Sequence, residues 1–184
     1  MPWQNVTGLA PKSFECGHCG NKVGAHQGFV SAQAPQSFIY VCPMCDKPTY
    51  IDPVQKRIPG ARFGQDVAHV PTAISELFNE ARSCCAFSAY TATVLLCRKL
   101  LMNIAVGLNA PENKPFIAYV EYLADQGYVP PNGKIWVDHI RKKGNEATHE
   151  IKVMTEQDAQ DLIGFSEMLL KFIYEFPGKI APQV

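Results

Sequence analysis

The chain has 184 residues, of which 47% are hydrophobic, and its 17 basic and 17 acidic side chains leave no net charge. A neutral chain of this length can bury a core, and its charge argues against a protein that coats nucleic acid or a membrane surface. It contains no run of about 18 apolar residues and no basic segment followed by an apolar one at its start. We therefore expect a soluble, cytoplasmic protein with no membrane partner.

Four of the seven cysteines form two Cys-x-x-Cys pairs, Cys16 with Cys19 and Cys42 with Cys45. An odd number of cysteines without a secretion signal argues against a disulfide framework. A gap of two residues lets both thiolates of a pair face one ion, and four sulfurs complete the tetrahedron that structural zinc prefers. The spacing predicts one structural Zn²⁺ bound by Cys16, Cys19, Cys42 and Cys45, with iron or a redox role as alternatives.

The segment around these cysteines is predicted to be a small β ribbon. Residues 37–41 and 49–51 are predicted strands that flank the second pair. So small a segment needs the metal for its folding energy, and a closed four-sulfur site has no open position for a substrate. His18 is interpreted as an exposed spacer between two ligands, with contact to a partner as the alternative. The Pro- and Gly-containing stretch 52–64 predicts a boundary near residue 65.

After this boundary the apolar residues recur with a period near 3.6, which is typical of helices. We predict a ribbon plus linker over 1–65 and a helical domain over 66–184. The fold class is mainly α, a small N-terminal β zinc ribbon followed by an all-α bundle. Thr155 and Asp158 form a capping pattern, and Pro177-Gly178 is expected to end the last helix. The predicted helices cover residues 71–82, 88–108, 114–125, 134–149 and 155–176.

Apolar stripes on two of these helices are expected to face the core. On the second helix they are Val94, Leu95, Leu101, Ala105 and Leu108, and on the last helix Leu162, Phe165, Leu169, Phe172 and Phe176. The remaining cysteines, Cys84, Cys85 and Cys97, lie in or beside apolar helix, which predicts a packing role.

The fourth helix carries the candidate chemistry. On a helical wheel its core face holds Trp136, Ile140, Gly144, Ala147 and Ile151, and its opposite face holds Asp138, Arg141, Lys142, Asn145 and His149. Arg141, Asn145 and His149 are four residues apart and follow one line. A guanidinium, an amide and an imidazole in a row suit phosphate binding and proton transfer. The alternative is an ordinary solvated helix face.

The run from Ile140 to Glu150 resembles the signature IRxxGNxAxHE of a prokaryotic family of unknown function in the HEPN superfamily. That family is found alone, behind zinc ribbons and attached to type I restriction subunits. Residues 90–101 resemble its second helix, including an arginine, and residues 155–159 resemble the start of its last helix. The resemblance covers about residues 71–178 and implies an HEPN-like helical bundle.

Active members of that superfamily resemble metal-independent ribonucleases with an Arg-Asn-x-x-x-His motif and usually dimerise so that two motifs share a cleft. Asn145 and His149 match the Asn and the His of the motif. Gly144 stands where the motif has its arginine, and Arg141 is the nearest arginine, one turn earlier. Met102 stands where relatives often have a glutamate.

Two functions follow from the resemblance and the residues. The first is a non-catalytic binding and dimerisation module, a homodimer through the helical domain that recognises RNA, DNA, a nucleotide or a partner protein. The second is a metal-independent endoribonuclease that uses Arg141, Asn145 and His149. The resemblance places both in prokaryotic antiviral defence, restriction or phage conflict.

Overall fold

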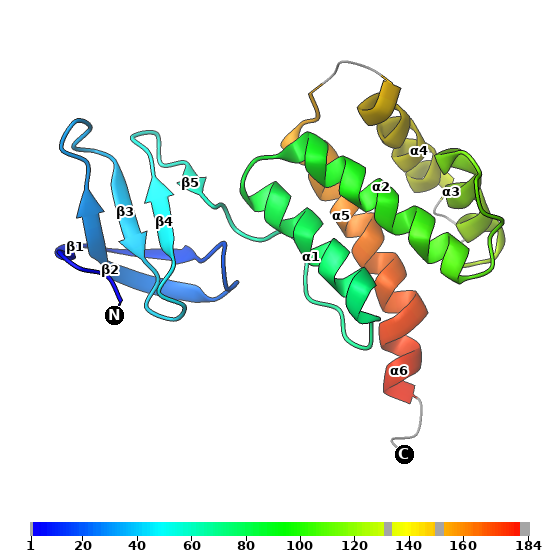
Figure 1. Ribbon diagram of the computed structural model, residues 1–184, viewed down its shortest axis with the longest axis horizontal. Coiled ribbons are helices and arrows are strands. Elements are labelled where there is room, and N and C mark those ends of the chain that lie inside the picture. Colours follow the sequence, from blue (N-terminus) through cyan, green and yellow to red (C-terminus); the bar gives the residue numbers. More distant parts are fainter. Residues whose placement is uncertain (1, 131–133, 150–152, 181–184) are drawn as a thin grey trace. The chain divides into compact units, whose positions relative to one another are not determined.

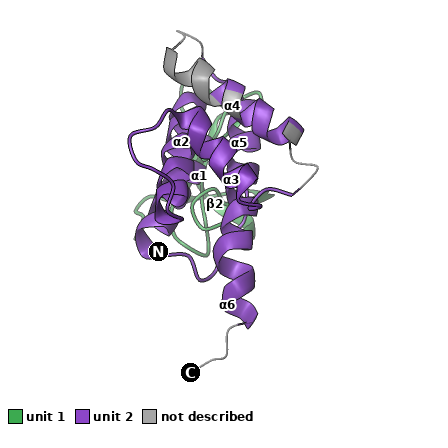
Figure 2. Ribbon diagram, turned by 90° about the vertical axis from the view of Figure 1, so that its right-hand side faces the viewer, with its two compact units in different colours: residues 1–62, 86–88 green, residues 63–85, 89–184 purple. Residues whose placement is uncertain are grey.

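The structure is a computed structural model that describes residues 2–130, 134–149 and 153–180 (Figure 1). For residues 134, 141 and 144–149 it describes the backbone alone. The chain separates into two compact units (Figure 2), residues 1–62 with 86–88 and residues 63–85 with 89–184. We call them the β unit and the helical unit.

The β unit is one antiparallel sheet in which each strand pairs with the next along the chain. Alternation along the second strand buries Val23 and Ala25, as expected when one face covers a core. Phe14 and Tyr40 meet edge to face on that side, with ring centroids 6.2 Å apart. The strands are β1 (Thr7–Glu15), β2 (Lys22–Val30), β3 (Phe38–Val41), β4 (Pro48–Ile51) and β5 (Arg57–Ile58).

The strands predicted over residues 37–41 and 49–51 are confirmed as β3 and β4. Strands β1, β2 and β5 were not predicted. Two glycines interrupt β2, and β1 contains Pro11 and a register shift between Gly8 and Lys12. Glycine and proline are depleted in strands, so these sequences carry a weak strand signal.

The helical unit confirms the predicted all-α region, with helix ends within a few residues of those expected. Thr155 accepts a hydrogen bond from the Asp158 backbone and Asp158 one from the Thr155 backbone, so the predicted cap is present. Among the described residues, no helix combines the length and apolar character needed to cross a bilayer. The helices are α1 (Thr72–Ala86), α2 (Tyr90–Gly107), α3 (Phe116–Asp125), α4 (Lys134–His149) and α5 (Glu156–Leu170).

The last helix does not end where the sequence predicts. After α5 the chain forms a π-turn, η2 (Lys171–Glu175), and continues through Pro177-Gly178 as α6 (Phe176–Ile180). A proline ring in a helix clashes with the carbonyl four residues earlier, and the wider π-turn directly before α6 relieves that clash.

Because of the same π-turn, the residues that face the core near the end of the last helix differ from those predicted. Leu162, Phe165 and Leu169 are buried as expected, but Phe172 and Phe176 are exposed. Ile173 and Tyr174 pack against the core instead, because a π-turn adds a residue to the turn and shifts the inward stripe by one position. Two more predicted core residues are exposed, Leu95 on α2 and Trp136 on α4.

Candidate metal centre and helical surfaces

The β unit brings the four predicted cysteines together. Their sulfurs all lie within 4.8 Å of one another, and Cys16 and Cys42 are fully buried. The Sγ–Sγ distances are 3.8 Å between Cys16 and Cys45 and 3.9 Å between Cys19 and Cys42. A regular tetrahedron with Zn–S arms of about 2.3 Å has edges of about 3.8 Å. The cluster therefore has the size and the donors of a four-coordinate metal site.

The two halves of the centre share one backbone geometry. Gly20 donates its backbone N–H to the Cys16 carbonyl over 2.8 Å, and Asp46 donates to the Cys42 carbonyl over 2.9 Å. Both donors adopt left-handed backbone angles, with φ of 71° at Gly20 and 55° at Asp46. Glycine adopts this conformation at no cost and Asp tolerates it, so each pair folds as the same tight knuckle.

The pKa values of Cys16, Cys19 and Cys45 depart from the ordinary value in different directions. Burial raises the pKa of Cys16, and burial is also the main cause that raises the pKa of Cys45 to about 12. Burial acts in the same direction on Cys19, but hydrogen bonds from Asn21 and from neighbouring cysteines outweigh it and lower the pKa to about 7. A coordinated cation deprotonates its thiol ligands, so a metal bound at this cluster would be held by thiolates.

His18 is not the free spacer that the sequence predicts. Its Nε2 lies 3.0 Å from the Pro48 carbonyl oxygen, at the start of β4. The imidazole is partly buried and joins the first knuckle to the strand that follows the second. We infer that His18 stabilises the arrangement of the two knuckles.

The three residues predicted for phosphate chemistry share one helix. The backbone of α4 is helical from residue 134 to residue 149, so Arg141, Asn145 and His149 follow one another a turn apart. Their side chains lie outside the described part of the structure. Arg141 and Asn145 come two residues after His139 and Lys143, so they occupy nearly the opposite side of α4.

Helices α4 and α5 meet along a seam of three side-chain pairs in antiparallel register. Neighbouring members of the seam are three or four residues apart on each helix. Each pair therefore lies about one helical turn beyond the pair before it. The pairs are Trp136 stacked on Phe165 (centroids 6.1 Å apart, planes at 11°), His139 Nε2 with Asp161 Oδ2 (2.8 Å) and Lys143 Nζ with Asp158 Oδ1 (2.8 Å).

Sequence reasoning missed the contact between His139 and Asp161. The available signal was the matching spacing of polar residues on two neighbouring helices, His139 with Lys143 and Asp158 with Asp161. Such spacing predicts pairing only when the two helices are known to be antiparallel neighbours, which a single sequence does not reveal.

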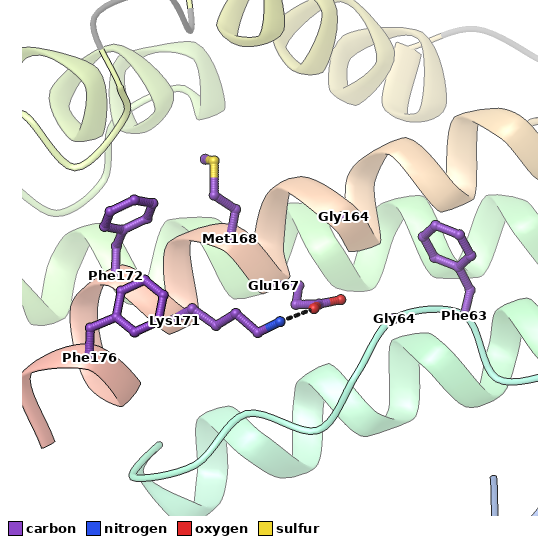
Figure 3. Close-up of a pocket in the computed structure, with 8 residues that line it drawn as sticks. All are labelled: Phe63, Gly64, Gly164, Glu167, Met168, Lys171, Phe172 and Phe176. Carbon is purple, nitrogen blue, oxygen red and sulfur yellow. Dashed lines mark hydrogen bonds and ion pairs between the residues drawn. The ribbon is translucent and has the colours of Figure 1, made fainter. Parts of the chain in front are cut away.

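The helical unit also carries an open groove of about 460 Å³ along α5, η2 and α6 (Figure 3). The aromatic rings of Phe63, Phe172 and Phe176 line it, and each is more than a third exposed. An ion pair between Lys171 and Glu167 forms part of the lining. Gly164 has open space where a side chain would begin, which widens the groove at that end.

The other cysteines of the helical unit are unsuited to nucleophilic chemistry. Burial raises the pKa of Cys85 to about 11 and that of Cys97 to about 12. The reactive form of cysteine is the thiolate, so both side chains are inert at neutral pH. Burial also raises the pKa of Cys84, which is only partly covered.

The sequence model of DUF4145, a domain of unknown function, matches residues 79–182. No curated protein and no solved structure gave a significant match to the chain. The matched region includes α2 to α6 and the second half of α1, but not the four clustered cysteines. Because the match covers more than half of the chain, the protein belongs to the DUF4145 family.

Proposed function

We propose that the protein is a zinc-ribbon protein whose HEPN-like helical unit binds nucleic acid or a nucleotide and dimerises, in a prokaryotic defence, restriction or phage-conflict setting. The observation that carries the proposal is the aromatic groove of the helical unit, because exposed apolar patches on small soluble units mark interaction sites. The biological setting rests on the resemblance of residues 140–150 to a restriction-associated family and not on site chemistry.

Zinc is the metal that we propose for the four cysteines. The support is the all-thiolate donor set, the 3.8 and 3.9 Å sulfur separations and the burial of Cys16 and Cys42. Elemental analysis of the purified chain should find one zinc per chain and a colourless protein. One iron per chain with visible thiolate-to-iron absorption would show that the four cysteines bind iron and not zinc.

Dimerisation through the groove is supported by its shape. Phe172 and Phe176 meet edge to face with centroids 5.4 Å apart and lie together at one end of the groove (Figure 3). The open space beside Gly164 lies toward the other end. A two-fold contact needs a surface that fits itself, and an exposed aromatic pair with an uncovered glycine along the same groove would meet that need when two copies pack antiparallel.

Light scattering after size exclusion tests this contact. Wild type should have the mass of a dimer, and Phe172→Ser should shift it toward the monomer. Leu95→Ser removes an exposed apolar side chain from α2 and serves as the matched control. A wild-type monomer at all concentrations, or a dimer that Phe172→Ser leaves unchanged, would remove the groove as the interface.

The second candidate function is a metal-independent endoribonuclease. The uninterrupted backbone of α4 favours it, because it spaces Arg141, Asn145 and His149 one turn apart. His149 would take the proton of an RNA 2′-hydroxyl, Arg141 would stabilise charge on the phosphate and Asn145 would position it. The 2′-oxygen would attack phosphorus, the bond from phosphorus to the 5′-oxygen would break, and that oxygen would take a proton from water. A 2′,3′-cyclic phosphate and a free 5′-hydroxyl would result.

RNA incubated with wild type and with His149→Ala separates the two functions. An enzyme should produce cyclic phosphate ends in the presence of chelator, and the variant should lose this activity. Equal background from both proteins would exclude catalysis by His149 and leave the binding module.

A further inference from the structure

The outer edge of α4 presents three chemically different side chains to solvent, Trp136, His139 and Lys142. They are spaced three residues apart, so neighbours lie on adjacent turns. Trp136 is 45% exposed although its ring stacks on Phe165, and the His139 side chain is 38% exposed although it bonds Asp161. Lys142 is exposed as well.

This exposure is confined to one part of the α4–α5 seam. The third pair is closed, with the Lys143 side chain 18% and the Asp158 side chain 8% exposed. A seam that only fastened two helices would gain from covering the indole and the imidazole in the same way. Trp136 and His139 therefore keep surface available for a ligand.

The imidazole of His139 is held in one orientation. Its Nε2 lies 2.8 Å from Asp161 Oδ2, and the other oxygen of that carboxylate accepts a hydrogen bond from Gln157 over 2.7 Å. An ionised carboxylate only accepts, so the contact with Asp161 requires a proton on Nε2, and in that tautomer of the neutral ring Nδ1 is an acceptor. Within the described part of the chain, Nδ1 has no hydrogen-bond partner. The edge thus offers an oriented acceptor beside an exposed indole.

We propose that Trp136, His139 and Lys142 bind one ribonucleotide unit. The base stacks on Trp136, a ribose hydroxyl donates to His139 Nδ1, and the phosphate pairs with Lys142. The order of aromatic face, acceptor and cation along about 9 Å of helix is the order of base, sugar and phosphate. This inference rests on the proposed binding function and specifies its ligand, a free ribonucleotide or a residue of single-stranded RNA.

Two carboxylates lie near this edge. Asp161 is engaged by His139 and Gln157, as described above. Asp138 has an interaction of its own and lies one turn before Lys142, so its charge opposes a phosphate bound there. Removing that charge should strengthen binding, whereas every other substitution in the site should weaken it.

A paired duplex is excluded as the ligand, because its stacked bases cannot reach the indole.

The first experiment uses the zinc-loaded full chain with Trp3→Phe, which leaves Trp136 as the sole tryptophan. The ligands are AMP, single-stranded oligoriboadenylate and the matching oligodeoxyadenylate. Each ligand that binds should quench Trp136 fluorescence, and the ribose hydroxyl should favour RNA over DNA by about threefold to tenfold. Tight binding of AMP would identify a free nucleotide as the ligand, and tight binding of the oligomer alone would identify RNA.

The second experiment measures how strongly single-site variants bind labelled oligomers, by fluorescence anisotropy, and so tests the contact proposed for each side chain. Trp136→Ala should weaken RNA and DNA alike by about tenfold, and Lys142→Ala should also weaken both. His139→Ala should weaken RNA alone and bring the RNA-to-DNA affinity ratio close to one. Asp138→Asn should strengthen both. Lys99→Ala removes an exposed lysine from α2 and is the control for Lys142→Ala.

The RNA-to-DNA ratio distinguishes a ligand contact from a structural role, because loosening the seam would weaken both oligomers equally. An unchanged ratio in His139→Ala would overturn the ribose contact. Wild-type binding that none of the site variants alters would overturn the site and leave the proposed binding function in place. The absence of binding to AMP, RNA and DNA alike would overturn both.

Discussion

The ammonium of Lys143 lies 2.8 Å from the carboxylate of Asp158, and the same carboxylate caps α5. Its other oxygen accepts hydrogen bonds from the backbone N–H and the hydroxyl of Thr155, over 2.9 and 2.8 Å. One side chain thus joins α4 to the start of α5. Burial raises the pKa of Asp158, but the hydrogen bonds from Lys143 and Thr155 outweigh it and lower the pKa to about 2.

This pKa predicts acid sensitivity of the helical unit. The folded pKa of about 2 lies below the ordinary aspartate value of 3.8, so ionised Asp158 stabilises the fold above about pH 4 and that stability is lost as the pH falls toward 2. Asp158→Asn should cost on the order of 2 kcal/mol at neutral pH. Urea unfolding of both proteins should show this difference shrinking as the pH is lowered.

The control for this pH series is Asp125→Asn, which removes an exposed carboxylate at the end of α3. It should change stability by no more than about 0.5 kcal/mol at any pH. A difference between wild type and Asp158→Asn that stays constant from neutral to acid pH would contradict the role of the ionised carboxylate.

Metal removal should unfold the β unit and leave the helical unit folded. The buried core of the β unit is small and includes Cys16 and Cys42 themselves, so without metal it loses part of its core and a major source of its folding energy. In a Trp136→Phe variant, a chelator should release Trp3 from Phe29 and from the Asp46 carbonyl and shift its fluorescence toward that of a fully solvated indole. Helical circular dichroism should persist, and its complete loss would show that the two units fold as one.

Local sequence patterns were sufficient for the clustering of the four cysteines and for most helix boundaries. A Cys-x-x-Cys knuckle is specified within a few residues, and its tight turns need only residues such as Gly20 and Asp46 that tolerate a left-handed backbone. Helix ends are likewise marked by local caps and prolines, as at Thr155. Features whose hydrogen bonds close within a short segment can be read from one sequence.

Features that depend on tertiary register could not be predicted in this way. Pro177 marks an irregularity in the last helix, but the sequence does not say that a π-turn at 171–175 accommodates it and turns Ile173 inward in place of Phe172. The contact between His139 and Asp161 requires the register of α4 against α5, which periodicity within either helix does not contain. Strand β2 depends on pairing with two neighbours more than on its own glycine-containing sequence.

Arg82 should be essential for the start of the helical unit. Its side chain is almost fully buried, and it donates to the carbonyls of Phe63 over 3.0 Å and Gly64 over 2.7 Å. Arg82→Met keeps much of the volume but leaves both carbonyls without a donor, at an expected cost of about 2–4 kcal/mol. Lysine lacks the planar fork that reaches two carbonyls, so Arg82→Lys should restore little of it.

Chemical denaturation and protease cleavage within residues 63–66 would measure the Arg82 effect. Lys99→Met, on the exposed side of α2, is the matched control and should behave like wild type. Retention of full stability and protease resistance by Arg82→Met would show that the carbonyls find other donors.

Two glycines of strand β2 should respond to alanine in different ways. A Cβ on Gly28 would lie 1.8 Å from the carbonyl oxygen of Ile39 in β3, whereas a Cβ on Gly24 would meet nothing within 4 Å. The obstacle at Gly28 is paired backbone, which cannot rotate away, so Gly28→Ala must separate β2 from β3 locally. We expect it to cost the zinc-loaded β unit about 1–3 kcal/mol, while Gly24→Ala stays within about 0.5 kcal/mol of wild type. Denaturation followed by Trp3 fluorescence measures both, and equal stability of the two variants would show that β2 and β3 are not as closely paired as the structure has them.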